Sequence, residues 1–372
     1  MKKKLISFLL SITLISQISM VLQMMPTLAA LLPELADNIS KLESLTEKFG
    51  LDCPYDYIES DEFKQSLAES TKILTDQSTV LELPDKTTMY AGDIHGDSKA
   101  VGRVLTHFAN LLKQGVDVQL IFTGDYDGGN NIIPTIYLLT RAHIWFPDRI
   151  FLLKGNHESK RFFDVSNADP DYDTEEFDLT NILPPWYGQL PLVATVGGNT
   201  VACHGSWDYR INSPAVLHGL RKRNVEITDS IEYAMTWSFP QNFRHYGSLK
   251  NNDYTMYDFS DPTDTCGYLH ILDSKMQVMG SIYIAKLLRR IYPDCRVLIG
   301  GHNHDMSGCE QEFEVDGSPF KMAKTICSCS IRTGKGRGQR VTRVANPYCF
   351  LVQQNGNPLA IEKVRVFPPS ES

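Results

Sequence analysis

Five short hydrophobic runs in this chain each end in a cluster of Gly, Asp, Asn or His. They are TMYAGDIHGD (88–97), VQLIFTGDYDGG (118–129), RIFLLKGNHES (149–159), TVACHGSW (200–207) and RVLIGGHNHD (296–305). Helix-like spacing of apolar residues fills the intervals at 99–115 and 131–146. Short apolar strands alternating with helices predict an α/β sheet, and the polar clusters then lie at the carboxyl ends of its strands, where such sheets bind ligands.

Before these runs the pattern is different. Residues 31–50 and 62–77 carry apolar side chains at helical spacing, so we expect a helical N-terminal segment over 31–85, ahead of a main domain over 86–365. Residues 1–30 combine MKKK, an apolar stretch and TLAA, which is typical of a secretory signal peptide. The alternative is a membrane anchor, since the apolar stretch is nearly long enough to cross a bilayer. Either interpretation predicts a protein exported to the periplasm or secreted, or one anchored by its N-terminus.

Composition narrows the possible functions. The 372 residues are 42% hydrophobic and 22% charged, as in globular proteins, and the net charge of −8 argues against non-specific nucleic-acid binding. We therefore expect no nucleic-acid partner, and a membrane partner only if the leader is retained. None of the eight cysteines forms a CxxC motif, so a zinc ribbon is not indicated, and Cys203 is expected to be a packed free thiol.

The residues that end the five runs have the chemistry of metal ligands. Hard cations prefer carboxylate and imidazole groups, and two cations held together need a carboxylate that bridges them. A lone histidine on a strand is more often structural, but five such clusters in one domain would bury several unpaired charges without a metal. The sequence therefore predicts a metal site among Asp93, His95, Asp125, Asn156, His157, His204, His302 and His304.

The motifs GDIHGD, GDYDGG, LLKGNHES, ACHGS and GGHNH resemble, in this order, the motif series of the calcineurin-like metallophosphoesterases. WFPDRIFLLKGNHE (145–158) resembles the phosphoprotein phosphatase branch, which contains the serine/threonine phosphatases, and the resemblance covers roughly residues 86 to 355. It implies a fold of two mixed β-sheets packed face to face and flanked by helices, with two divalent or trivalent ions (Mn, Fe or Zn) between the strand ends.

The resemblance also implies roles. Phosphate monoesters would be hydrolysed by direct attack of a metal-bridging hydroxide, and His157 would be the general acid that protonates the leaving alcohol. His304 has two possible interpretations, a further ligand of the first ion or a surface residue in a loop. The implied ligands are Asp93 and His95 for the first ion, Asp125 for both, and Asn156, His204 and His302 for the second.

The segment GDYDGGN (124–130) departs from the branch, which has GDYVDRG there. One deleted residue aligns Asp127 with the carboxylate that orients the catalytic histidine, whereas an ungapped alignment places a glycine there. The phosphate-gripping arginine is missing in both alignments, and glycine cannot replace its bidentate contact. The segment RTGKGRGQRVTR (332–343) is either a phosphate-binding loop or a solvated basic hairpin. Candidate substrate-binding residues are Arg161, Arg244, Arg332 and Arg337.

Three functions follow from these observations. The first is an exported metal-dependent phosphatase acting on phosphorylated proteins. The second is a hydrolase of small phosphate esters, phosphodiesters or dinucleoside polyphosphates, which the missing arginine and the paired histidines of GHNH favour. The third is a weakly active relative that binds phosphorylated partners, although a binding protein has no need of a general acid such as His157.

Overall fold

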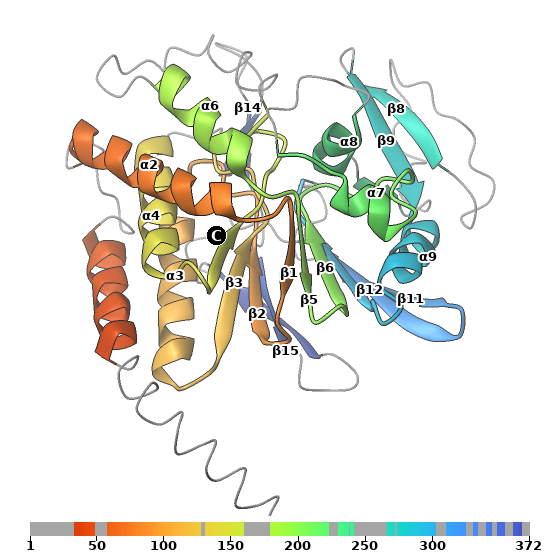
Figure 1. Ribbon diagram of the computed structural model, residues 1–372, viewed down its shortest axis with the longest axis horizontal. Coiled ribbons are helices and arrows are strands. Elements are labelled where there is room, and N and C mark those ends of the chain that lie inside the picture. Colours follow the sequence, from red (N-terminus) through yellow and green to blue (C-terminus); the bar gives the residue numbers. More distant parts are fainter. Residues whose placement is uncertain are drawn as a thin grey trace, which may run out of the picture.

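The computed structural model of the protein contains two packed β-sheets, with helices on both outer faces (Figure 1). In the view of Figure 1, α2 (Ser60–Asp76), α3 (Ser98–Lys113), α4 (Ile132–Trp145) and α6 (Leu179–Gln189) lie on the left, most of the strands in the middle, and α7 (Pro214–His218), α8 (Ile231–Trp237) and α9 (Ser281–Ile291) on the right. The structure describes residues 33–48, 58–127, 131–159, 179–222, 230–237, 239–241, 266–271, 274–302, 310–324, 330–333, 340–343, 348–353 and 360–366.

The strands form two large sheets, one of six strands in the order β1-β5-β6-β10-β12-β11 and one of five in the order β16-β15-β2-β3-β4. The six-stranded sheet contains β1 (Val80–Leu83), β5 (Val193–Val196), β6 (Thr200–Cys203), β10 (Val297–Gly300), β11 (Glu310–Val315) and β12 (Ser318–Lys324). The five-stranded sheet contains β2 (Thr87–Ala91), β3 (Val118–Phe122), β4 (Ile150–Leu152), β15 (Tyr348–Gln353) and β16 (Ala360–Arg365).

Smaller elements complete the described part of the chain. A three-stranded sheet has the order β7-β9-β8, and β13 pairs with β14 as an antiparallel ribbon. These strands are β7 (Phe239–Gln241), β8 (Cys266–Ile271), β9 (Ser274–Gly280), β13 (Ser330–Thr333) and β14 (Arg340–Arg343). The helices are a first helix over 33–48, α2 (Ser60–Asp76), α3 (Ser98–Lys113), α4 (Ile132–Trp145), α6 (Leu179–Gln189), α7 (Pro214–His218), α8 (Ile231–Trp237) and α9 (Ser281–Ile291).

Alternation along the buried strands creates the layers. On β3, Leu120 and Phe122 pack in the cluster that contains the helices of one side, whereas Ile121 packs in the cluster between the two sheets. On β6, Val201 and Cys203 face the helices of the other side, and Ala202 faces the opposing sheet. Because successive side chains of a strand point to opposite faces, each sheet has helices on one face and the other sheet on its second face. The resulting order is helix, sheet, sheet, helix, as the resemblance implied.

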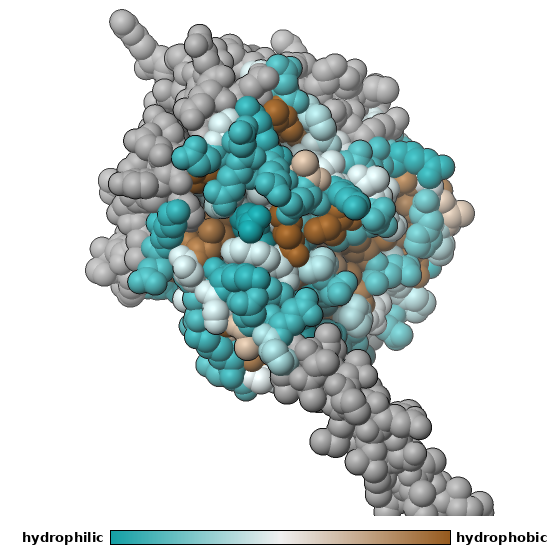
Figure 2. Space-filling model, turned by 60° about the vertical axis from the view of Figure 1, so that its left-hand side comes forward, coloured by the Kyte–Doolittle hydropathy of each residue, from teal (hydrophilic) through white to brown (hydrophobic). Residues whose placement is uncertain are grey.

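The predicted helices are confirmed, and α3 and α4 match the expected ranges closely. Helix α2 and the first helix bury Phe63, Leu67, Ile39 and Leu42 in the same core cluster as the five-stranded sheet. The end of the range assigned to a helical segment is instead strand β1, which pairs parallel to β5. On the side of these helices the surface is mostly hydrophilic with scattered hydrophobic patches (Figure 2), as amphipathic helices require.

The leader over 1–30 lies outside the described residues, so its role as signal peptide or anchor stays a prediction. Among the helices that the structure describes, none has the length and apolar character needed to cross a membrane. The buried Cys203 is a free thiol, as the sequence indicated.

Strand register brings the five polar clusters together. Strands β2, β3 and β4 run parallel, with Ala91 beside Phe122 and Phe122 beside Leu152. In the opposing sheet β6 and β10 also run parallel, with Ala202 beside Ile299. Each cluster follows its strand directly, so parallel strands deliver them to one edge. The clusters thus come from both sheets and meet where the sheets end.

Candidate metal centre

The backbone at the strand ends is strained at the predicted ligands. Among the described residues, five non-glycine residues have positive φ, and four of them are Asp93 (49°), His95 (47°), Asp125 (57°) and His302 (68°). The left-handed region is unfavourable for residues with a side chain, and strain of this kind gathers at functional sites. Three separate strand-end loops have therefore adopted costly conformations, at four of the predicted ligands.

Asp125 is the carboxylate at which the histidines converge. Its Oδ1 lies 3.2 Å from His204 Nε2, and its Oδ2 lies 3.6 Å from His95 Nε2 and 3.8 Å from His157 Nε2. Two groups of residues could each hold a metal ion. The first is His95 with Asp125 and His157, and the second is Asp125 with His204 and His302. Within each group the ligand atoms lie within 4.8 Å of one another. Asp125 is shared by both groups, as expected of a bridging ligand.

Asn156 lies between the histidines of the second group. Its Oδ1 is 2.8 Å from His302 Nδ1 and 2.9 Å from His204 Nε2. With the amide turned over, the nitrogen at the same position lies 3.2 Å and 3.3 Å from the two Asp125 oxygens. An amide oxygen, two imidazole nitrogens and a carboxylate converging on one point form the donor set that transition-metal ions bind, so these residues fit the metal that the motifs imply.

Asp93 faces the end of β10. Both of its carboxylate oxygens accept the backbone N–H of His302 at 2.9 Å, and Oδ1 lies 3.7 Å from His204 Nδ1. The neighbouring Gly301 leaves the room for this carboxylate, because a Cβ there would lie 2.0 Å from Asp93 Oδ1. Asp93 belongs to neither of the two metal-holding groups but borders the second through His204 and His302.

The charges of the site act on one another. Burial alone would raise the pKa of Asp125, but His204, His157 and His95 hold it well below its usual range. Burial alone would lower the pKa of His157, but the carboxylates of Asp125 and Asp127 raise it to about 9. The pKa of His204 is raised for the same reason, by Asp125 and Asp93. The site therefore favours a negative Asp125 surrounded by imidazoles.

Asp127 and His157 form a pair beside this cluster. Asp127 Oδ1 lies 3.2 Å from His157 Nδ1, and the backbone carbonyl of Asp127 lies 3.2 Å from His95 Nδ1. His157 is 8% exposed, whereas Asp127 is completely buried. The contact is the one expected from the gapped alignment of GDYDGGN, and it leaves His157 Nε2 on the side of Asp125.

Glu158, which was not among the predicted site residues, joins two of the loops. Its Oε2 accepts the backbone N–H groups of Asp125 (2.9 Å) and Gly155 (2.7 Å), and its Oε1 accepts that of Tyr126 (2.7 Å). One buried carboxylate thus satisfies three amides from the loops after β3 and β4. Its position as the last residue of KGNHE was a signal that it belongs to the site, although its partners were not predictable.

Two aromatic residues were also missed. Tyr187 of α6 donates its hydroxyl to Asp127 Oδ2 at 2.7 Å. Trp237, the last residue of α8, packs edge-on against His302 with ring centroids 6.0 Å apart. Both come from helices that precede or follow the motif strands, and an aromatic residue in an amphipathic helix is normally interpreted as core.

Most of the predicted substrate-binding residues and one predicted ligand lie outside the described residues. Arg332 lies in strand β13 rather than in a loop, because residues Ser330–Thr333 pair with Arg340–Arg343. The remaining predictions, Arg161, Arg244, Arg337 and His304, lie outside the described residues.

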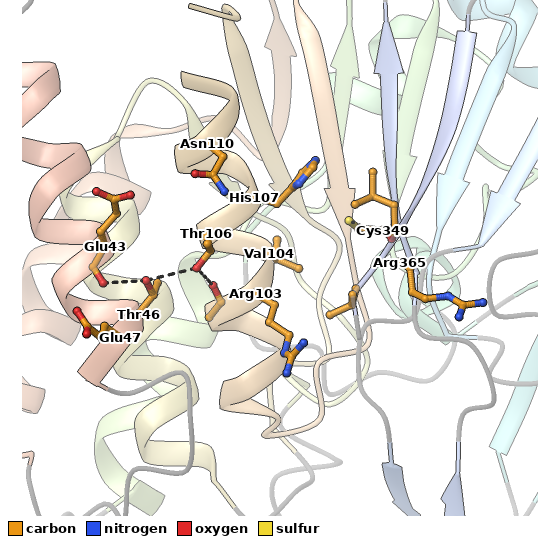
Figure 3. Close-up of a pocket in the computed structure, with 13 residues that line it drawn as sticks. Glu43, Thr46, Glu47, Arg103, Val104, Thr106, His107, Asn110, Cys349 and Arg365 are labelled. Carbon is orange, nitrogen blue, oxygen red and sulfur yellow. Dashed lines mark hydrogen bonds between the residues drawn. The ribbon is translucent and has the colours of Figure 1, made fainter. Parts of the chain in front are cut away.

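A cavity of about 590 Å³ lies elsewhere, between the first helix, α3 and the ends of β15 and β16 (Figure 3). Arg103 and His107 line it from α3, and Cys349 and Arg365 from the two strands. Thr106, also of α3, donates a hydrogen bond to Thr46 of the first helix. None of the predicted site residues lines it, so this cavity is separate from the candidate metal centre.

Comparison with known proteins agrees with this geometry. A serine/threonine-protein phosphatase of Caenorhabditis elegans is 30% identical over 180 residues, which cover 45% of this chain and 37% of the relative. The chain therefore spans about a third of that relative's length. A solved protein serine/threonine phosphatase from Saccharomyces cerevisiae shares the fold, with a TM-score of 0.57 at 15% identity over 84% of this chain and 91% of that one. The model of the calcineurin-like phosphoesterases matches residues 87–306, more than half of the chain, and the chain belongs to this family.

Proposed function

We propose that the protein is a metal-dependent phosphatase that hydrolyses phosphate monoesters, with phosphorylated proteins as its substrate class. The observation that carries the proposal is the sharing of Asp125 between two groups that could hold metal ions, the first of which includes His157 of the buried His157–Asp127 pair. Family membership and the C. elegans relative support the reaction class and the substrate class, respectively.

The motif resemblance implies that the first ion would be held by Asp93, His95 and Asp125, with His157 of the first group reserved for proton transfer, although Asp93 itself contacts His302 and His204. The second ion would be held by Asp125, Asn156, His204 and His302. Bound Mn, Fe or Zn ions withdraw charge from phosphoryl oxygens and promote attack by water near neutral pH. Asp125 belongs to both groups and so fixes their relative position. Asp125 is itself held in place because its backbone N–H donates a hydrogen bond to Glu158.

His157 is the proposed general acid. Asp125 and Asp127 raise its pKa to about 9 despite burial, which favours the protonated imidazole that a general acid requires. Asp127 Oδ1 holds Nδ1, so the proton available to an alkoxide leaving group is the one on Nε2. An alkoxide is a poor leaving group, and its protonation is the step for which phosphoserine and phosphothreonine need such an acid.

Activity measurements test this proposal. The purified chain, supplied with manganese, iron or zinc, is expected to hydrolyse p-nitrophenyl phosphate. The Asp125→Asn variant should lose most of this activity, while the matched His218→Gln variant, which changes an exposed histidine paired with Glu82, should keep it. A wild-type chain that is inactive with every metal would overturn the enzymatic proposal and leave binding of phosphorylated partners as the alternative.

A second candidate function has one observation in its favour. The segment GDYDGGN lacks the arginine that grips phosphate in the phosphoprotein phosphatases, which suits hydrolysis of small phosphate esters, diesters or dinucleoside polyphosphates. A panel of phosphoserine and phosphotyrosine peptides, bis(p-nitrophenyl) phosphate and a dinucleoside tetraphosphate decides between the two. We expect the highest kcat/KM for the phosphopeptides, and a preference for diesters or dinucleotides would replace the first candidate by the second.

Export is proposed from the N-terminal sequence alone. N-terminal sequencing of the protein produced in its own host, after fractionation, distinguishes the two forms of this proposal. A mature chain that begins close to TLAA (27–30) supports a cleaved signal peptide. An intact Met1 in the membrane fraction supports the anchor, and an intact chain in the cytoplasm contradicts both.

A further inference from the structure

Tyr187 contacts the carboxylate that holds the proposed general acid. Its hydroxyl donates to Asp127 Oδ2 at 2.7 Å, while Asp127 Oδ1 lies 3.2 Å from His157 Nδ1. Tyr187 is 1% exposed, Asp127 is completely buried and His157 is 8% exposed. Each oxygen of this carboxylate therefore has one fixed side-chain partner, the tyrosine on one side and the imidazole on the other.

The helix that carries Tyr187 is itself held in place. The adjacent Trp186 donates its indole N–H to Ser70 Oγ of α2 at 3.0 Å and packs on Tyr126 with centroids 5.9 Å apart. Tyr126 directly precedes Asp127, and its hydroxyl donates to the carbonyl of Leu153 at 2.7 Å. Helix α6 and the loop after β3 are thus tied together at two neighbouring residues, so the Tyr187 hydroxyl has little freedom relative to Asp127.

We propose that Tyr187 is a positioning residue for the general acid, acting through Asp127. This inference rests on the proposed function, in which His157 protonates the leaving group. Without the hydroxyl, the Asp127 carboxylate loses the hydrogen bond that it accepts from Tyr187 and is free to rotate about its last torsion. The Nδ1 contact is then less well fixed, and Nε2 is less often aimed at the leaving oxygen.

Leaving-group dependence tests the proposal with the full chain. A general acid matters greatly for a poor leaving group and little for a good one. For the Tyr187→Phe variant we expect a loss of roughly 10-fold in kcat on phenyl phosphate, a clearly smaller loss on p-nitrophenyl phosphate, and an unchanged KM. The matched control is Tyr137→Phe, which removes a hydroxyl bonded to Glu62 in the same helical layer and should match the wild type on both substrates.

A double-mutant cycle shows whether Tyr187 acts through His157. In the His157→Gln background, Tyr187→Phe should cause no further loss on phenyl phosphate. A full additional loss, or an equal loss on both substrates in the single variant, would overturn the positioning role and leave a structural tyrosine. No loss on phenyl phosphate would overturn it as well.

A readout that needs no turnover separates this inference from the proposed function. The ¹⁵N resonance of His157 Nδ1, observed in the labelled chain, should shift in Tyr187→Phe and not in Tyr137→Phe. An unshifted resonance contradicts the inference even if the enzyme is active. A shifted resonance in a chain that hydrolyses no phosphate ester would support the contact and contradict the proposed function.

Discussion

Two buried histidines in this molecule have opposite environments. His157 follows β4 at the edge where the sheets end, and the Asp125 and Asp127 carboxylates raise its pKa to about 9 against the effect of burial. His143 lies in α4 between helices, completely buried, and burial lowers its pKa to about 4. Burial alone therefore does not determine the charge of a histidine, because neighbouring carboxylates can reverse its effect.

The partners of His143 are neutral. Its Nδ1 lies 3.0 Å from Ser70 Oγ, which also accepts the indole N–H of Trp186 at 3.0 Å. Its Nε2 is buried and has no hydrogen-bond partner among the described residues. The helix interface thus holds a neutral imidazole that links α2, α4 and α6, whereas the carboxylates at the strand ends favour a charged one. The first contributes to packing, and the second is the proposed proton donor.

The largest expected effect comes from replacing each histidine by glutamine. His157→Gln should reduce kcat on an alkyl phosphate such as a phosphoserine peptide by ~10²–10⁴-fold, because the leaving alkoxide is no longer protonated. His143→Gln should leave kcat within about twofold, because it lies away from the described ligands. Steady-state kinetics of both variants measure the difference. Equal losses in the two variants would remove the distinction between the sites.

The pH dependence of stability sharpens the same comparison. Above pH 6.5, His143 is neutral in both the folded and the unfolded chain. Between pH 6.5 and about 4 the unfolded chain binds the proton first, so the free energy of unfolding should fall by up to about 3 kcal/mol as the pH decreases. Denaturant titrations of wild type and His143→Gln between pH 7 and 4 measure the effect. The variant should lose this contribution, and identical pH profiles would contradict the low pKa.

A smaller effect is expected at the hydroxyl that joins the helices. Ser70→Ala removes the partner of both His143 Nδ1 and Trp186 Nε1 and should lower the free energy of unfolding by ~1–3 kcal/mol. Ser40→Ala is the control, since that exposed hydroxyl bonds to the Ala36 carbonyl of its own helix. Denaturant unfolding compares the two variants, and an equal effect would mean that the buried cluster contributes nothing specific.

Local pattern was enough to predict the strands and helices around the site. The apolar runs before Asp93, Asp125, Asn156, His204 and His302 became β2, β3, β4, β6 and β10, because each run and its polar end are contiguous in sequence. Parallel pairing then needs only the register to bring the ends together. The strand β1 was missed because VLEL is a short apolar run directly after a long helix.

Contacts between distant segments could not be predicted in the same way. Tyr187 and Asp127 are 60 residues apart, and nothing in LPPWYGQ distinguishes a tyrosine that meets a carboxylate from one that fills the core. The link between Ser70, His143 and Trp186 spans three helices whose packing follows from the whole core. Likewise the three hydrogen bonds that Glu158 accepts from backbone N–H groups depend on the conformation of two loops, which the spacing of residues in the sequence does not specify.

The central claim is that Asp125 joins two metal-holding groups at the ends of the sheets. Its most direct test is the metal content of the chain after equilibration with manganese, measured by mass spectrometry for wild type, Asp125→Asn and His143→Gln. We predict two ions per chain in wild type and His143→Gln, and fewer than one in Asp125→Asn. A wild-type chain without bound metal under manganese, iron and zinc, or an Asp125→Asn chain that retains both ions, would contradict the claim.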